Sequence, residues 1–366
     1  MKLLIDLSSC DLRYSSITVL SLRILKGFVD NGVGDVTILC NTVVIDAVKE
    51  ICSGYEIVPI EMTRRISAMN LLKSYWRWRK IVKGIDYDVI YLPHPFPPFH
   101  CIYNKGRIVT TMLDIEGLKS HKGIKLIVFK LVYQLALRRS HRLTTISEFV
   151  RQDILKTYPF VLEDSIKAVH CSVVVGTPLK ADSPLNDKYI LYVSSFLRHK
   201  NVFTLVRAFS LLRDQIPHKL VLIGRENDLW QNEVIPYIKI NDLTSRIVHI
   251  GSGVTDNDLA RWYKHADLFV HPSYMEGFGY PPVEAAILGA PVITTKETSL
   301  EEVTMGLLNY YEPATDEHAL ANKILDVLQN RPSIEKLKEI SEIYKKEYEY
   351  RKIAKELYNE LLITID

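Results

Sequence analysis

The sequence has 366 residues, more than one average domain requires and enough for two domains with separate cores. Hydrophobic residues make up 47% and charged residues 24%, as in an ordinary globular protein, and a net charge of +3 does not indicate a nucleic-acid partner. The five cysteines form no C-x-x-C pair and have no histidine at metal-ligand spacing, so they indicate a reducing compartment rather than a zinc site.

The first half of the chain alternates short apolar runs with segments of helical periodicity. The predicted strands are Leu3–Leu7, Val36–Cys40, Ile57–Ile60, Val89–Leu92, Ile108–Leu113 and Leu143–Ile146. The predicted helices are Ser16–Asn31, Thr42–Cys52, Ser67–Val82, Gly123–Ser140 and Ser147–Tyr158. This alternation predicts a parallel sheet covered by helices on both faces.

The second half repeats this plan after a polar, proline-containing linker at Gly176 to Lys188. The predicted strands are Tyr189–Val193, Leu220–Ile223, Ile247–Ile250, Leu268–Val270 and Val292–Thr294. The predicted helices are Phe203–Arg213, Leu229–Lys239, Asp256–His265 and Pro282–Leu288, followed by a charged helical tail from Asp316. We therefore predict two doubly wound α/β domains, formed by residues 1–178 and 179–347.

No part of the sequence is expected to cross a membrane. The opening MKLLIDLSSC has too short an apolar run for a signal peptide. The most apolar long segment, Ile124 to Leu137, is interrupted by Lys125 and Lys130 and is too short to span a bilayer. We expect a cytoplasmic protein that is free or attached peripherally to the inner face of the plasma membrane.

The most informative stretch runs from His271 to Ile293 and reads HPSYMEGFGYPPVEAAILGAPVI. Its loop follows a predicted strand, and open α/β sheets bind ligands at the carboxyl ends of their strands. Glu276 is predicted on this loop and Glu284 in the first turn of the next helix. The alternative is that Glu276 is a solvated loop charge and Glu284 a partner of the helix dipole.

The residues between the two glutamates favour a binding loop. Gly277 and Gly279 allow a sharp turn and a close approach of backbone amides to a ligand. Pro281 and Pro282 suit the first turn of a helix, whose N-terminal end would face an anion such as a diphosphate. Because a carboxylate would repel that anion, Glu284 is better suited to accept hydrogen bonds from ribose hydroxyls.

The sequence EGFGYPPVEA, with LGAPVI after it, resembles the signature of family 4 glycosyltransferases, a large retaining family with the GT-B fold. The resemblance implies two Rossmann-like domains that face each other across a cleft. It also implies that a hexose moves from a GDP- or UDP-sugar to a glycan or lipid-linked glycan in bacterial surface-polysaccharide synthesis. In this family the first glutamate lies beside the donor sugar and the second binds the ribose. The residues that the resemblance places at the donor are Glu276, Gly277, Phe278, Gly279, Tyr280 and Glu284.

The first strand of the second domain continues into a loop, YILYVSSFLRHKN, that also resembles the family. Lys200 and Asn201 match a Lys-Asn pair, which implies that Lys200 contacts the donor diphosphate. A fixed cation there would stabilise the negative charge that a nucleoside diphosphate gains as it leaves. A solvated loop lysine is the alternative.

Three further residues in this half are expected near the donor. Ser195 stands where the family often has arginine or threonine, and we expect its hydroxyl to donate a hydrogen bond while Arg198 or His199 supplies a second cation. Arg225 follows the strand KLVLI and is expected to contact the base or a phosphate, although a surface arginine is equally consistent with the sequence.

The first domain matches the family less closely. The segment VTTMLDIEG places Asp114 at a family aspartate, which makes Asp114 a candidate catalytic residue, whereas Leu113 stands in place of the preceding histidine. Glu116 or His94 could compensate for that missing polar group, but the sequence favours the alternative that His94 is a loop histidine with ordinary hydrogen bonds. The domain is interpreted as the acceptor side, and a C-terminal helix at about 348–366 is expected to pack on it.

The stretch Arg64–Lys83, RRISAMNLLKSYWRWRKIVK, is basic and aromatic and contains no acidic residue. As a helix it could contact anionic lipid with its tryptophans at headgroup depth. The alternative is that its aromatic side chains pack on the sheet and its basic side chains are solvated.

No Asp-x-Asp motif or cluster of acidic residues and histidine has the spacing of a metal site, so we expect neither metal nor cofactor. We predict a metal-independent retaining hexosyltransferase. The alternatives are a degenerate GT-B protein that binds a nucleotide sugar or a partner without transfer, and a different GT-B enzyme such as an epimerase or a phosphorylase.

Overall fold

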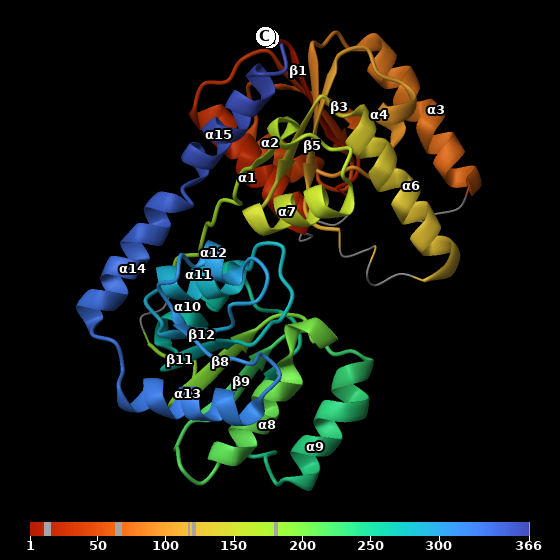
Figure 1. The fold of residues 1–366 in the computed structure, drawn as a ribbon. Helices are drawn as coiled ribbons and strands as arrows, with labels where there is room; N and C mark the ends of the chain where they lie inside the picture. The colour runs from red at the N-terminus through yellow and green to blue at the C-terminus, as the bar shows by residue number, and fades with distance from the viewer. Residues whose placement is uncertain (11–15, 63–67, 116–117, 119–121, 179–181, 366) are drawn as a thin grey trace. The chain divides into compact units, whose positions relative to one another are not determined.

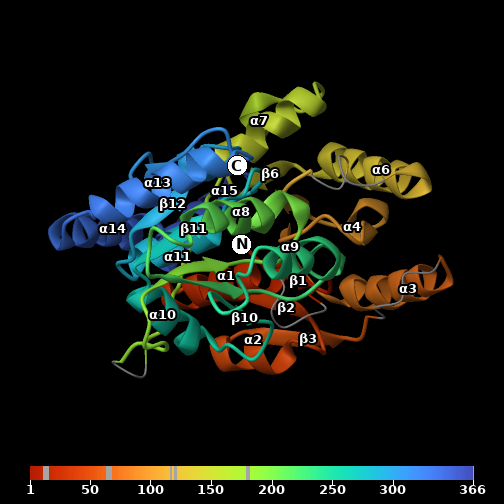
Figure 2. The ribbon, with the colours of Figure 1, turned by 90° about the horizontal axis from the view of Figure 1, so that it is seen from below.

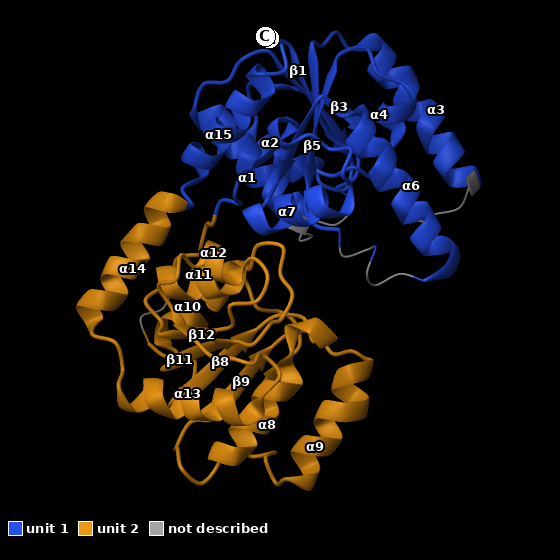
Figure 3. Ribbon diagram, in the orientation of Figure 1, with its two compact units in different colours: residues 1–172, 348–366 blue, residues 173–347 orange. Residues whose placement is uncertain are grey.

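The computed structural model describes residues 1–10, 16–62, 68–115, 118, 122–178 and 182–365. The chain forms two compact units (Figure 3). Unit 1 comprises Met1–Ser172 and Tyr348–Asp366, and unit 2 comprises Val173–Glu347. Among the described residues, no helix is long and apolar enough to cross a membrane.

Unit 1 is built on a seven-stranded parallel sheet with the order β3-β2-β1-β4-β5-β6-β7 (Figure 1). Its strands are β1 Leu3–Leu7, β2 Val36–Asn41, β3 Glu56–Ile60, β4 Val89–Leu92, β5 Arg107–Met112, β6 Arg142–Thr145 and β7 Ile166–Ala168. Its helices include α1 Ser16–Asp30, α2 Ile45–Ile51, α3 Ala68–Gly84, α4 Phe99–Ile102, α6 Gly123–Arg139 and α7 Glu148–Thr157. All residues of β1 and β4 are buried, as central strands covered on both faces require.

The last helix of the chain, α15 (Tyr350–Leu362), belongs to unit 1 and packs along α1. Gly27 makes this approach possible, because a Cβ at residue 27 would lie 2.3 Å from the Cβ of Ala354. Arg142 Nε donates a hydrogen bond to Glu360 Oε2 at 2.6 Å and ties α15 to β6.

Unit 2 has a six-stranded parallel sheet with the order β10-β9-β8-β11-β12-β13. Its strands are β8 Tyr189–Val193, β9 Lys219–Ile223, β10 Ile247–Ile250, β11 Leu268–His271, β12 Val292–Thr294 and β13 Asn309–Tyr310. Its α-helices are α8 Val202–Leu212, α9 Ile235–Ile240, α10 Asp256–His265, α11 Tyr280–Ile287, α12 Leu300–Val303, α13 Glu317–Gln329 and α14 Ile334–Glu347. The strand order reverses between β8 and β11, and this switch point is where ligands bind in such sheets.

The basic aromatic segment predicted at Arg64–Lys83 is helical from Ala68, while residues 63–67 lie outside the described residues. Its two tryptophans have different environments. Trp78 is fully buried and donates its indole N–H to the carboxylate of Asp6 at 2.7 Å, whereas Trp76 is exposed. Trp78 thus packs on the sheet, as the second sequence interpretation predicted, and the contact of the helix with lipid stays a prediction.

Candidate functional site

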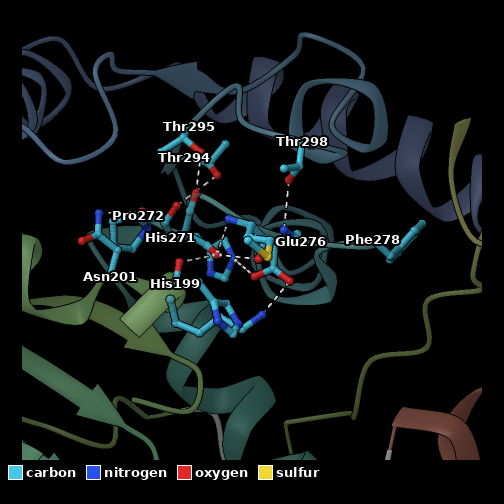
Figure 4. A network of polar contacts seen from close by, with 12 residues as sticks. His199, Asn201, His271, Pro272, Glu276, Phe278, Thr294, Thr295 and Thr298 are labelled. Carbon is cyan, nitrogen blue, oxygen red and sulfur yellow. Dashed lines mark hydrogen bonds and ion pairs between the residues drawn. The ribbon is translucent and has the colours of Figure 1, made fainter. Parts of the chain in front are cut away.

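Two loops of unit 2 meet at the switch point of its sheet. Lys200 ends a short 3-10 helix after β8, and Glu276 lies in the loop between β11 and α11. Lys200 Nζ donates a hydrogen bond to Glu276 Oε2 at 2.7 Å (Figure 4). Their side chains are only 18% and 9% exposed, so neither residue is a solvated loop charge.

His271, the last residue of β11, holds the other oxygen of the Glu276 carboxylate. Its Nε2 lies 2.8 Å from Glu276 Oε1, and its ring is fully buried. Its Nδ1 has no hydrogen-bond partner among the described residues. A proton on Nδ1 would therefore be a buried, unsatisfied donor, which favours the tautomer whose Nε2 donates to Glu276.

The Glu276 carboxyl is ionised despite its burial. Burial alone would raise its pKa, but the hydrogen bond from His271 and the positive charge of Lys200 outweigh burial and hold the pKa at about 2. The site consequently presents a fixed carboxylate beside a fixed ammonium. Glu276 uses one of the three N–H donors of Lys200, and such a group can also bind an anion.

A hydroxyl-rich segment after β12, Thr295–Ser299, fixes the backbone of the Glu276 loop. Thr298 Oγ1 accepts a hydrogen bond from the Glu276 backbone N–H at 2.9 Å, and Ser299 Oγ donates to the Glu276 carbonyl at 2.9 Å. Thr295 Oγ1 donates to the carbonyl of Ser273 at 2.6 Å. Thr298 has a left-handed φ of 56°, which is strained for a β-branched residue and is typical of functional sites.

Asn201 fixes the loop that carries Lys200. Its amide nitrogen donates to the carbonyls of Pro272 at 3.0 Å and Ala314 at 2.7 Å, and its amide oxygen accepts from Thr204 at 2.7 Å. These contacts attach the loop after β8 to the end of β11. In this Lys-Asn pair, Lys200 carries the charge and Asn201 fixes the loop that positions it.

The loop turns into α11 at Gly279, which has a φ of +94°. A side chain there would also meet Leu300, because a Cβ would lie 2.7 Å from Leu300 Cδ2. The helix begins at Tyr280 rather than at Pro282, so Glu284 lies in its second turn and not in the predicted first turn. Since Pro281 has no N–H, the helix start is a poorer anion site than predicted.

Comparisons with known proteins agree with this arrangement. A profile of the family described as Glycosyl transferases group 1 matches residues 178–346, which is nearly all of unit 2. Unit 2 therefore has the sequence pattern of the group 1 glycosyltransferases.

Two curated bacterial proteins show the same relationship. The chain is 26% identical to O-antigen chain mannosyltransferase B of Escherichia coli over 249 residues, which is 64% of each protein. It is 24% identical to O-antigen chain mannosyltransferase RfbU of Salmonella typhimurium over 307 residues, which covers 80% of the chain and 81% of RfbU. The chain thus spans less than two thirds of the first relative.

The solved structure of HepE from Anabaena in complex with UDP and glucose superposes with a TM-score of 0.74 at 16% identity, covering 99% of both chains. This likeness confirms the predicted GT-B fold of the glycosyltransferase. Units 1 and 2 of the present chain each have the doubly wound parallel sheet that the sequence predicted.

Glu284 of this glycosyltransferase is held by α10. Tyr263, which is buried, donates its hydroxyl to Glu284 Oε2 at 3.3 Å. Burial and the nearby Glu284 carboxylate raise the pKa of Tyr263 well above its ordinary value, so the phenol stays protonated and remains a donor. This contact orients the carboxylate that the sequence assigned to the ribose.

Three other residues predicted near the donor follow β8 or β9 in the chain. Ser195 and Arg225 are both exposed at the ends of β8 and β9. Arg198 is exposed and forms an ion pair with Glu233, and its part as a second cation stays a prediction. Gly224 serves packing, because a Cβ there would lie 2.1 Å from the carbonyl oxygen of Ser194.

In unit 1, Asp114 follows β5 and His94 follows β4. Burial lowers the pKa of His94, while its hydrogen bond with Phe96 and the Asp114 charge oppose that shift. The hydrogen bonds of His94 with Phe96 lie within its own loop, and compensation for Leu113 stays a prediction. Glu116 lies outside the described residues.

Sequence reasoning missed His271 and the segment Thr295–Ser299. His271 looked like the end of an apolar strand, and only its proximity to Glu276 reveals its part. The run TTKETS carried a usable signal, since several hydroxyl residues directly after a buried strand can hold a neighbouring loop.

Proposed function

We propose that this glycosyltransferase is a retaining, metal-independent hexosyltransferase that uses a nucleoside-diphosphate sugar. The observation that carries the proposal is the buried Lys200–Glu276–His271 arrangement at the switch point of the unit 2 sheet. Lys200 would stabilise the departing diphosphate, and Glu276 would lie beside the donor sugar. The hydroxyl of the acceptor would attack on the face that the diphosphate leaves, with the diphosphate accepting its proton.

The remaining donor contacts are assigned within unit 2. Glu284, oriented by Tyr263, would accept hydrogen bonds from the ribose. The backbone amides of Gly277, Phe278, Gly279 and Tyr280, with Ser195 and Arg225, would contact the diphosphate and nucleoside. A hollow of about 300 Å³ is lined by Pro184, Ile250, Ser252, Gly253, Val254, Asp258, Arg261 and Trp262, and we assign the base to this region.

The acceptor is proposed to be a glycan or lipid-linked glycan of a surface polysaccharide. The relatives support this, since their names describe O-antigen chain mannosyltransferases, and they make mannose the first hexose to test. These names do not favour a degenerate protein that binds without transfer. We assign acceptor binding to unit 1, with Asp114 as the polar group that contacts the incoming sugar.

The protein is proposed to work at the inner face of the plasma membrane. The support is α3, which has five basic residues, no acidic residue and an exposed Trp76. A peripheral location would bring the enzyme to an acceptor anchored in lipid.

The test is release of nucleoside diphosphate from a panel of GDP- and UDP-hexoses, in EDTA, with an acceptor extract from a polysaccharide-producing bacterium. We expect one donor to turn over, and Glu276→Ala to abolish its turnover while the circular dichroism spectrum stays unchanged. Asp114→Asn should raise the KM for the acceptor more than that for the donor. Nucleotide binding without turnover of any donor would overturn the proposal in favour of the degenerate protein.

A further inference from the structure

The N-terminal half of α6 exposes a row of apolar side chains. Ile124, Ile127, Val128 and Leu131 are between 45% and 81% exposed. Their three- and four-residue spacing places them on one face of the helix. Buried residues of α6 are concentrated near its other end, at Tyr133, Ala136 and Leu137. Single exposed apolar residues are common on protein surfaces, but a contiguous row of four large ones indicates a contact surface.

Helix α3 carries a second row of the same kind. Met69, Leu72 and Trp76 are between 54% and 63% exposed and are also spaced along one helical face. The short helix α4 contacts both α3 and α6. Figures 1 and 2 show α3 and α6 extending from the sheet toward the same side of unit 1.

The charges carried by both helices have one sign, although Arg77 of α3 forms an ion pair with Glu61 outside the helix. Neither α3 nor α6 contains an acidic residue. Exposed basic residues accompany the apolar rows, and they are Lys73, Lys80 and Lys83 on α3 and Lys125 and Lys130 on α6. The guanidinium of Arg79 lies over the ring of Trp76 at 5.2 Å and keeps a further positive charge beside the α3 row.

We propose that α3 and α6 together form a lipid-docking surface, with the α6 row inserted among the acyl chains of an anionic monolayer. Apolar side chains accompanied by lysines match such a monolayer, because the side chains enter its apolar part while the ammonium groups meet phosphates. A second copy of this chain fits less well, since two surfaces of the same charge repel each other. The purpose that we give to this surface, access to a lipid-linked acceptor, rests on the proposed function. The lipid binding itself does not.

Cosedimentation with vesicles tests the surface without donor or acceptor. The vesicles contain phosphatidylglycerol and phosphatidylcholine, or phosphatidylcholine alone. We expect binding only to the first kind and weaker binding at high salt. Ile127→Asp/Leu131→Asp should lower the partition coefficient at least about tenfold, because charged side chains would enter the acyl region. The matched control is Ile240→Asp/Ile334→Asp, which changes two exposed isoleucines of unit 2 and should bind like the wild type.

Tryptophan fluorescence provides a second measurement. Anionic vesicles should shift the emission to shorter wavelength in the wild type. Trp76→Phe should remove most of that shift, since Trp78 and Trp230 are buried and the partly buried Trp262 belongs to unit 2. Absence of wild-type binding, or equal binding by the α6 variant, would overturn the inference. The inference would also be overturned if the wild type formed a concentration-dependent dimer but did not bind vesicles, and the α6 variant abolished that dimer. Nucleotide release with a soluble acceptor reports separately on the proposed function.

Discussion

The molecule departs from the usual distribution of polar and apolar groups in two regions, and in opposite directions. Unit 2 buries the charges of Lys200 and Glu276, whereas α3 and α6 of unit 1 expose rows of large apolar side chains. Buried charges and exposed apolar patches are the two informative exceptions to normal burial. We interpret each arrangement as a place where the protein contacts something else.

The two regions should therefore respond differently to substitution. Substitution of Lys200 or Glu276 should impair both activity and stability, because removal of one charge leaves the other unpaired in a low-dielectric site. Changes in the exposed rows should leave both properties nearly unchanged in solution.

The largest effect is expected from Glu276→Gln. An amide of nearly the same shape removes the negative charge that we propose to lie beside the donor sugar, and it should lower kcat by about 10³. Steady-state nucleotide release measures this loss, and a matched circular dichroism spectrum controls for folding. Retention of more than a tenth of the activity would show that the charge is not used in the reaction.

Lys200→Met should lower kcat/KM by about 10² through loss of the cation at the diphosphate. Because Lys200 and Glu276 form one ion pair, the double variant with Glu276→Gln should lose far less than the product of the two single losses. The measurement is a double-mutant cycle on kcat/KM. Strict additivity would mean that the two residues act independently.

Gly279→Ala should lower the free energy of unfolding by about 1–3 kcal/mol, because it combines a left-handed φ with a clash against Leu300. Urea denaturation measures the change. Gly289→Ala is the matched control, since its φ of +86° is also left-handed but no atom lies within 4 Å of its added Cβ. Equal destabilisation of the two variants would assign the whole cost to backbone conformation.

The pH dependence of stability follows from the lowered pKa of Glu276. A carboxyl whose pKa falls from 4.5 to about 2 on folding stabilises the protein above pH 4.5, and this contribution is lost as the pH falls toward 2. The unfolding free energy of the wild type should thus fall more steeply than that of Glu276→Gln in this window, by at most about 1.4 kcal/mol per pH unit. Parallel curves from urea denaturation at several pH values would contradict the pKa shift.

The smallest effect is expected from Ile127→Ser/Leu131→Ser on α6. Both side chains are exposed, so the unfolding free energy should change by less than about 0.5 kcal/mol per site, and activity toward a water-soluble acceptor should persist. Thermal denaturation and nucleotide release measure these quantities. A large loss of stability would show that the row packs within the protein and is not a contact surface.

The sequence predicted the doubly wound sheets and the importance of Glu276 and Lys200, because strand periodicity and the EGFGYPPVEA motif are local signals. It did not predict that these two residues pair with each other. That contact spans 76 positions and depends on β8 lying beside β11, which is a property of strand order rather than of any local pattern. His271 was missed for a different reason, because it lies only five positions before Glu276 and looked like the last residue of an apolar strand.

The environments of the two tryptophans in α3 show a second limit of sequence reasoning. Helical periodicity identified the helix but not which of Trp76 and Trp78 faces the sheet, because that depends on the position of Asp6 in β1. The short strands β7 and β13 have three and two residues, too few for a period to be recognised. The start of α11 was misplaced because Pro282 was taken as the first helical residue, whereas Gly279 sets the turn.

The return of α15 to unit 1 has a consequence for biosynthesis. A ribosome makes the chain from the N-terminus, so residues 173–347 are complete before the helix that covers α1 exists. Until then, the face of α1 around Gly27 lacks its cover. Unit 2 can therefore finish folding before unit 1, although unit 1 begins first, and a nascent chain stalled before Tyr350 would present an uncovered apolar face to chaperones.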